Sequence, residues 1–217
     1  MSEVFASSNS RQLLLGALLA IAMVVATVPA TATTLDVTGG AAIDGSFGMA
    51  INFTPASTTR AYVEDASPSG ETHYVFRYRF DPNEIIMDDN KRYKQFTAFR
   101  ETPSQYRCIN VTYRKNGTDN FFRIKSHMNP ASAEWQRTAW ITLPEGPSVL
   151  EVDWTAASGP GAADGEMRVW LDGTLIETVP NLDNDECAID FVRWGAVGGV
   201  DPNTDGAQNF DLFESFR

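Results

Sequence analysis

Apolar and polar residues alternate with a period of two along most of this chain, and this alternation constrains the fold more than any other feature. In the segment "THYVFRYRF", the aromatic residues Tyr74, Phe76, Tyr78 and Phe80 occupy every second position. Residues two apart on an extended chain point to the same side, so the segment predicts a strand with one dry and one wet face. Strands of this kind bury their dry faces when two antiparallel sheets stack.

Eleven segments show the same pattern between turn residues, and no amphipathic helix is evident after Thr33. Many short strands at regular spacing are typical of an antiparallel sandwich or barrel. We therefore expect an all-β fold in the form of a two-sheet antiparallel β-sandwich. The expected strands cover residues 46–53, 72–80, 93–100, 105–114, 121–128, 135–143, 148–154, 165–173, 174–179, 188–197 and 209–216.

Two dipeptides mark tight turns between neighbouring strands. Asn116-Gly117 and Asp172-Gly173 both adopt positive φ readily, which two-residue hairpin turns require. The first should join strand 105–114 to strand 121–128. The second should join strand 165–173 to strand 174–179.

The N-terminal segment has the features of an export signal rather than of a folded element. Arg11 precedes the apolar run 13–28, and the small residues 30–32 follow it. This order predicts a secretory signal peptide over residues 1–32 and one β-sandwich domain over residues 33–217. The alternative is a membrane anchor, for which the run is short and too rich in Gly and Ala. We expect a secreted protein, extracellular or periplasmic, without a membrane span after cleavage.

The formal net charge of −11 is distributed unevenly along the chain. Residues 60–137 carry 13 Lys or Arg against 10 Asp or Glu, whereas residues 138–217 carry 3 against 15. The acidic second half argues against nucleic acid and anionic membranes as partners. The mildly basic middle of the chain leaves room for a local site that binds an acidic ligand.

Cys108 and Cys187 are the two cysteines of the chain. In an exported protein the oxidising compartment favours a disulfide between them. The alternative is a pair of buried thiols. With two histidines in all, nothing in the sequence indicates a zinc site or a nucleophile triad.

Several stretches resemble one group of secreted bacterial proteins, the concanavalin A-like, laminin-G-type jelly rolls. They are "ETHYVFRYRFDPN", "LPEGPSVLEVDWTAAS", "GEMRVWLDGTLIETVPNLDND", "DFVRWGAVGGVD" and the ending "FDLFESFR". The resemblance implies a sandwich of two curved antiparallel sheets with one concave face. The superfamily contains lectins, adhesion modules, glycanases and polysaccharide lyases, so this fold does not determine the function.

A pair of carboxylates, Glu151 and Asp153, shares one face of strand 148–154. Jelly-roll glucanases of this superfamily carry E-x-D-x-E or E-x-D-x-x-E on one strand, but here the third carboxylate is absent. A retaining glycosidase needs a second carboxyl group across the scissile bond, held protonated. We therefore interpret the pair as part of a solvated strand face.

Basic side chains on the wet faces of several strands are the candidates for ligand binding. Jelly-roll polysaccharide lyases hold the uronate carboxylate with a positive group and use His or Tyr as base and acid. The two strand motifs of the alginate lyases, Q-I-H and R-x-E-L-R, are absent. A lyase site would require Arg77 or Arg79 to converge with Lys125 and His127, the preferred base. The candidate ligand-binding residues are Arg77, Arg79, Arg114, Arg123, Lys125, His127 and the wet-face aromatic Trp170.

A calcium ion is the one metal that the sequence suggests. The stretch "DPNTDG" places the oxygen-bearing side chains of Asp201, Asn203 and Asp205 at alternate positions, like the start of an EF-hand loop. Leu212 stands where that loop has its bidentate Glu, and an ordinary Asp/Asn turn is the alternative. The family resemblance separately implies that Asp211, on the last strand, binds a structural Ca²⁺.

These observations favour a secreted, non-catalytic module that binds a carbohydrate or another surface polymer and requires no cofactor. One alternative is a structural or interaction protein of the envelope or extracellular space. The other is a polysaccharide lyase that acts on an acidic glycan. The oligomeric state is left open.

Overall fold

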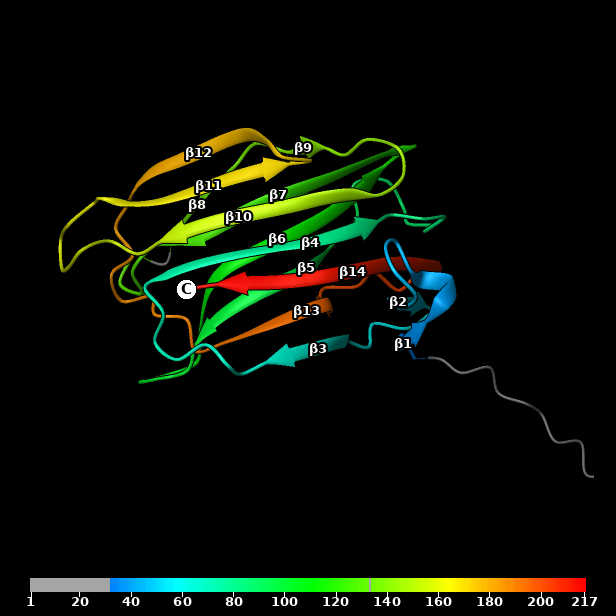
Figure 1. Cartoon of the computed structure of the whole chain (residues 1–217), viewed down its shortest axis with the longest axis horizontal. Coiled ribbons are helices and arrows are strands. Elements are labelled where there is room, and N and C mark those ends of the chain that lie inside the picture. Colours follow the sequence, from blue (N-terminus) through cyan, green and yellow to red (C-terminus); the bar gives the residue numbers. More distant parts are fainter. Residues whose placement is uncertain (1–31, 133) are drawn as a thin grey trace, which may run out of the picture.

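The computed structural model describes residues 32–132 and 134–217, which form two stacked antiparallel sheets of seven strands each (Figure 1). This confirms the expected all-β sandwich, and the arrangement is consistent with a jelly roll. The signal peptide predicted for residues 1–32 lies outside the described residues except for its last position. Sheet A has the order β1 (Thr34–Thr38), β2 (Gly48–Phe53), β14 (Gly206–Phe216), β4 (His73–Asp81), β10 (Ser148–Thr155), β11 (Gly165–Leu171) and β12 (Thr174–Leu182).

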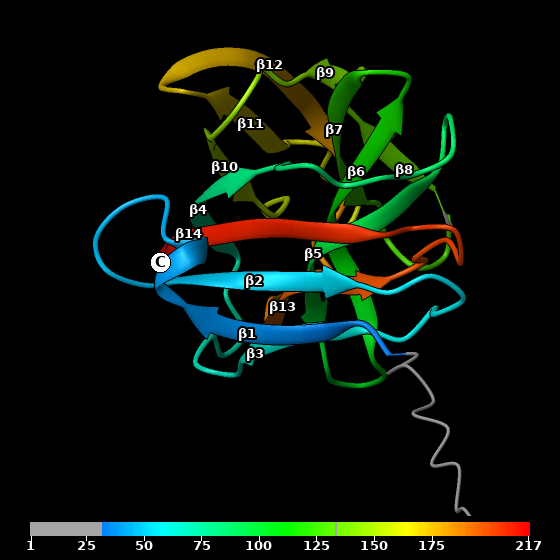
Figure 2. The same ribbon diagram turned by 90° about the vertical axis from the view of Figure 1, so that its right-hand side faces the viewer.

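Sheet B forms the second layer and contains the strands that hold the site described below. A single 3-10 turn, η1 (Gly39–Ala41), interrupts the strands, and no α-helix occurs in the described part of the chain. Figure 2 shows β1, β2 and β14 side by side at one end of sheet A. Sheet B has the order β3 (Ala61–Asp65), β13 (Phe191–Gly198), β5 (Arg92–Arg100), β6 (Tyr106–Asn116), β7 (Asp119–His127) and β8 (Trp135–Arg137), and β9 (Ile141–Thr142) also pairs with β7.

The core lies between the two sheets and is rich in aromatic side chains. Phe76 of β4 and Phe96 of β5 stack with ring centroids 3.9 Å apart, so one contact joins the middle of both sheets. Trp154 of β10 is fully buried and donates its indole N–H to the Ser126 hydroxyl of β7 over 2.9 Å. The aromatic side chains predicted to share the dry face of strand 72–80, Tyr74, Phe76, Tyr78 and Phe80, are all buried. The period-two pattern therefore assigned this face correctly.

Both predicted hairpins are present. Leu171 pairs with Thr174 around Asp172 and Gly173, and both turn residues have positive φ, as a type I′ turn requires. In the other hairpin Asn116 pairs with Asp119, so the turn consists of Gly117 and the residue after it, one position later than expected.

Three elements differ from the sequence prediction. Strands β1 and β3 were not expected. Each is an edge strand of five residues, and the two strands together contain a single buried residue, which leaves little alternation to detect. The expected strand 135–143 is divided into β8 and β9. Between β8 and β9, the Thr138 N–H donates to the Ile124 carbonyl, and the Thr138 hydroxyl oxygen accepts the Ile124 N–H. These bonds end the regular ladder.

Cys108 of β6 and Cys187, in the segment between β12 and β13, form the expected disulfide, with Cα atoms 5.7 Å apart. This separation is ordinary for a disulfide. The bond ties the start of β6 to the connection that leads into β13, two strands away in sheet B. Among the described residues, no helix has the length and apolar character needed to cross a bilayer.

Gly195 in β13 should tolerate a side chain poorly, for two reasons. Its φ is +124°, and a Cβ there would lie 2.7 Å from the Ala61 carbonyl oxygen of β3. Gly199 also has positive φ but has open space around it. We expect Gly195→Ala to lower the free energy of unfolding by about 2–4 kcal/mol, the sum of backbone strain and overpacking. Gly199→Ala should cost about 1 kcal/mol, for strain alone. Urea denaturation measures both, and equal losses would contradict the steric argument.

The disulfide should contribute strongly to stability because its two cysteines are 79 residues apart in the sequence. We expect the double variant Cys108→Ala, Cys187→Ala to lose about 2–5 kcal/mol of unfolding free energy, mainly because the unfolded chain gains freedom. Urea denaturation with and without a thiol reductant provides the measurement. The reductant should destabilise the wild-type protein and leave the double variant unchanged. A double variant as stable as the oxidised wild type would refute this role.

Candidate functional site

The outer face of sheet B, which points away from the core, contains the hollows of the candidate site. Across this face the paired residues form a row in which Arg193 lies opposite Thr97, Thr97 opposite Asn110, and Asn110 opposite Lys125. Thr97 donates its hydroxyl proton to the Asn110 side chain over 2.8 Å. The centre of the face is therefore an uncharged polar floor, and cations flank it on both sides.

Cations surround this floor in unusual number. Nine Lys and Arg side chains lie on this face, and Arg193 alone among them has an acidic partner in the described chain. Its Nε lies 2.8 Å from Glu64 Oε2. The other eight take part in none of the salt bridges of the described residues. The nine cations, which we call the basic face, are Arg60, Arg92, Lys94, Arg107, Arg114, Arg123, Lys125, Arg137 and Arg193.

The basic face shifts the titration of its own lysines. Burial lowers the pKa of Lys125 from its usual value, and neighbouring cations, Arg92 foremost, lower it further. The pKa of Lys94 is lowered in the same way, first by burial and then by Arg107 and other arginines. A bound anion would raise the pKa of both lysines, because it supplies the opposite charge that the face lacks.

Trp140 is held between two guanidinium groups at one side of this face. The Arg114 and Arg123 guanidinium carbons lie 4.1 Å and 4.0 Å from its ring centroid. The Nε atoms of both arginines are buried without a hydrogen-bond partner in the described chain. Cation–π contact thus takes the place of ion pairing here and leaves both charges uncompensated.

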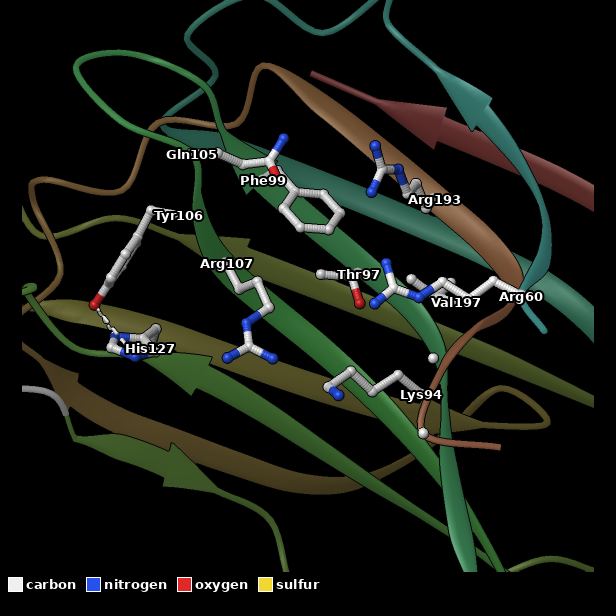
Figure 3. A pocket seen from close by; sticks show the side chains of 12 residues that line it. Arg60, Lys94, Thr97, Phe99, Gln105, Tyr106, Arg107, His127, Arg193 and Val197 are labelled. Carbon is white, nitrogen blue, oxygen red and sulfur yellow. Dashed lines mark hydrogen bonds between the residues drawn. The ribbon is translucent and has the colours of Figure 1, made fainter. Parts of the chain in front are cut away.

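Tyr106, at the start of β6, and His127, at the end of β7, lie in direct contact and line one of the hollows on the outer face of sheet B (Figure 3). The Tyr106 hydroxyl donates to the Met128 carbonyl over 2.8 Å, and His127 Nδ1 lies 2.7 Å from the same oxygen. The rings of Tyr106 and Trp135 flank the imidazole edge-on, with centroids 4.3 Å and 4.2 Å away.

Burial moves the pKa values of Tyr106 and His127 apart. It raises the pKa of Tyr106 to about 12, and Arg100 opposes part of this rise. It lowers the pKa of His127 below its usual 6.5. At neutral pH the imidazole is therefore uncharged and able to accept a proton, while the phenol keeps its proton and is able to donate it.

Two structural links hold Tyr106 in place. The Arg100 guanidinium lies 5.1 Å from the Tyr106 ring centroid and donates to the Glu186 carbonyl over 2.6 Å. The residue after Glu186 is Cys187, whose disulfide partner Cys108 is two positions beyond Tyr106. The disulfide and the arginine thus fix both sides of the segment that carries the tyrosine.

The structure brings together part of the predicted ligand-binding set. Arg114, Arg123, Lys125 and His127 share the basic face, as the alternation of their strands indicated. Their role as ligand contacts stays a prediction.

Arg77, Arg79 and Trp170 lie on the outer face of sheet A, on the other side of the sandwich. Arg77 pairs with Glu214, and Arg79 lies 3.2 Å from Asp44. The Arg168 guanidinium carbon lies over the Trp170 ring, 5.6 Å from the ring centroid. The condition stated for a lyase site, convergence of Arg77 or Arg79 with Lys125 and His127, is therefore not met, because β4 and β7 belong to different sheets.

Glu151 and Asp153 also face outward on sheet A, away from the hollows of the basic face. Asp153 accepts hydrogen bonds from Arg168 over 2.6 Å and from His73 over 2.9 Å. Glu151 lies in register between Arg77 and Trp170. These contacts agree with the interpretation of the pair as a solvated strand face.

The proposed calcium ligands of the "DPNTDG" stretch bond to protein groups instead of converging. Asp201 lies 2.9 Å from Lys91 Nζ, and Asn203 donates its amide to Asp88 over 2.7 Å. Asp205 accepts the N–H of the next residue.

Asp211, the ligand that the resemblance implied, is likewise occupied. One of its oxygens accepts the N–H groups of Ile43 and Asp44. The other accepts the N–H of Leu212. No group of three or more His, Cys, Asp or Glu side chains suited to a metal occurs in the described residues. The donor set as arranged does not fit calcium, and calcium binding stays a prediction.

Several residues of the site were missed by the sequence reasoning. Tyr106 and Arg107 both precede a register shift in the pairing of β5 with β6, between Ala98 and Phe99, so parity counted back from Arg114 does not place either residue. Arg60 and Arg193 come from parts of the chain that alternation alone does not place next to β5.

No protein-family model matches the chain, and no curated protein is similar to it in sequence. Its backbone is nevertheless similar to those of several solved carbohydrate-active proteins. It matches an endo-β-1,4-glucuronan lyase from the fungus Trichoderma reesei with a TM-score of 0.59 and 12% identity, over 83% of this chain and 85% of that chain. It matches a carbohydrate esterase from the Shiga toxin-encoding bacteriophage phi24B with a TM-score of 0.58 and 11% identity, over 85% and 87%.

A third similar structure is that of the alginate lyase Aly36B, with a TM-score of 0.56, 11% identity and coverage of 84% of this chain and 86% of that chain. At such low identity these likenesses establish the fold alone. The chain is thus a two-sheet antiparallel β-sandwich of a kind that solved polysaccharide lyases and a carbohydrate esterase also adopt.

Proposed function

We propose that the protein binds an acidic, uronate-containing polysaccharide along the basic face of sheet B. The observation that carries this proposal is the group of eight cations without a carboxylate partner in the described chain. Five of them, Arg60, Arg92, Lys94, Arg107 and Lys125, line hollows, in a protein whose formal net charge is −11. A carboxylate on each successive sugar would supply the missing opposite charges.

Two further observations support a glycan as the ligand. Two of the structurally similar proteins are named as lyases of glucuronan and of alginate, both acidic polysaccharides. The predicted signal peptide and the disulfide fit an oxidising extracellular or periplasmic compartment, in which such polymers occur. The proposed ligand is therefore an acidic glycan outside the cytoplasm, whether or not the protein cleaves it.

The charge on Lys125 should matter for binding, because Lys125 is half-buried at the edge of the uncharged floor. We expect Lys125→Gln to weaken the binding of glucuronate or alginate oligosaccharides about tenfold, the effect of losing one charged hydrogen bond. The matched control is Arg77→Gln on sheet A, which should change the dissociation constant less than twofold. Isothermal titration calorimetry with each purified protein provides the measurement.

Equal losses for both variants would place the ligand elsewhere on the molecule or make the attraction a general charge effect. Absence of binding to every acidic and neutral oligosaccharide tested would refute the proposal. It would leave the structural or interaction protein as the better account.

The contact between Tyr106 and His127 favours a second candidate function, cleavage of the bound polysaccharide by β-elimination. With its proton on Nδ1, His127 donates to the Met128 carbonyl and carries its lone pair on Nε2. That nitrogen lies 3.3 Å from the Tyr106 oxygen. A proton acceptor and a proton donor thus stand together, which elimination requires.

The reaction follows from these two groups and the cations. His127 takes the proton from C5 of the uronate, whose acidity rises because a cation such as Arg107 neutralises the adjacent carboxylate. The electrons of the C5–H bond form a C4=C5 double bond, and the C4–O bond to the neighbouring sugar breaks. Tyr106 gives its proton to the departing oxygen. The proton on His127 then passes to the Tyr106 oxygen and restores both groups.

His127 must be uncharged to act as the base, so the rate should rise with pH as its imidazole loses its proton. Because burial lowers that pKa, the midpoint of the rise should lie below the usual value of 6.5. A fall at high pH should follow deprotonation of Tyr106, whose pKa of about 12 places it far from neutrality. A rate constant that is flat across neutral pH is the expected profile.

We expect Tyr106→Phe and His127→Asn each to lower the elimination rate by roughly a hundredfold to ten-thousandfold. The ultraviolet absorbance of the new double bond measures the rate, and calorimetry measures binding by the same variants. His73→Asn, on the opposite face of the sandwich, is the matched histidine control and should retain full activity. Wild-type binding without any unsaturated product from any uronate polymer would reject cleavage and retain the binding proposal.

A further inference from the structure

Three hollows on the outer face of sheet B join into one groove. The central hollow, about 360 Å³ in volume, shares Lys94 with a hollow of about 300 Å³ on one side. It shares Gln105 and Arg193 with a hollow of about 430 Å³ on the other side. Lys94 lies near the start of β5, whereas Gln105 precedes Tyr106, which pairs with Arg100 at the end of β5. The groove therefore follows the length of β5, and Figure 3 shows its central part.

The groove begins with positive charge. The hollow at the start of β5 contains Arg92, Lys94 and Lys125 and no acidic side chain. The central hollow adds Arg60 and Arg107, again without an acidic side chain. The charged side chains that a uronate would meet in either hollow are all cations.

The groove ends with negative charge. The hollow beyond the end of β5 contains Glu64, Glu101 and Asp190, with Arg193 as its one cation. Glu64 is paired with that arginine. Asp190 accepts backbone N–H groups on both oxygens, from Gly70 and from the residue after Arg100. The Glu101 side chain makes none of the hydrogen bonds or salt bridges of the described residues and is exposed.

We infer that the protein selects an acidic heteropolysaccharide, with a uronate in the central hollow and an uncharged sugar in the hollow beside Glu101. This inference rests on the proposed function and names its substrate more narrowly. A second uronate in the acidic hollow would bring like charges together, which opposes binding. The hydroxyl groups of an uncharged sugar would instead donate to the free carboxylate of Glu101.

The position of Tyr106 and His127 agrees with this division. Tyr106 directly follows Gln105, the residue that borders both the central and the acidic hollow. The pair therefore stands at the change of charge along the groove. A bond cleaved there would join the uronate to the uncharged sugar.

The test compares two probes of equal length by calorimetry. One is a homopolymeric glucuronate oligosaccharide, and the other alternates glucuronate with N-acetylglucosamine. We expect Glu101→Lys to tighten binding of the homopolymer about fivefold, within the range of one exposed charge interaction. It should leave binding of the alternating probe unchanged or weaker. Glu84→Lys, in an exposed loop outside the groove, makes the same change in net charge and should alter neither affinity.

The outcomes separate this inference from the proposed function. If Lys125→Gln weakens both probes but Glu101→Lys behaves like Glu84→Lys, the acidic hollow has no role in selection and the inference is overturned, while acidic-glycan binding stands. If Glu101→Lys tightens both probes equally, the uncharged sugar is not recognised and the inference is again overturned. If the wild type binds neither of these probes nor any alginate oligosaccharide, both proposals fail together.

Discussion

The packing of the two inner sheet faces against each other is the constraint on which the rest of this structure depends. The Phe76–Phe96 stack joins the sheets at their middle, and fully buried aromatic rings surround it. Such an interior excludes charged groups, since an unpaired buried charge costs far more than a lost hydrogen bond. Each strand must therefore place its polar side chains on an outer face. The two outer faces are consequently free to differ in charge while the core stays the same.

The outer faces differ in how they manage charge. On sheet A, Asp153 pairs with Arg168, and Glu214 pairs with Arg77, so these arginines have acidic partners across the strands. On sheet B, Arg123 and Lys125 have cationic neighbours and lowered pKa values instead of acidic partners. Uncompensated charges of one sign destabilise the folded chain. Where a protein keeps a locally unfavourable arrangement of this kind, a functional site is the usual reason.

The sequence predicted those properties that a single strand determines and not those that require knowledge of its neighbours. Parity placed Arg123, Lys125 and His127 on one wet face, and the structure agrees. It did not show that Arg79 lies on the other sheet, because β4 pairs with β10 and β14, which are distant in the sequence. Sheet membership depends on such long-range pairing. Arg107 was missed for a different reason, since the register irregularity near Cys108 changes the face of the residues before it.

The concentration of positive charge on one face of an acidic protein has a consequence for how the molecule meets a polyanion. Seen from far away, the protein is an anion and repels another anion. Only within about one Debye length, roughly 8 Å at physiological salt, does the basic face dominate the local potential. The protein is thus an electric dipole whose orientation is selected during approach. Encounters through sheet A or the edges of the sandwich should be unproductive, and an anionic polymer should bind through sheet B alone.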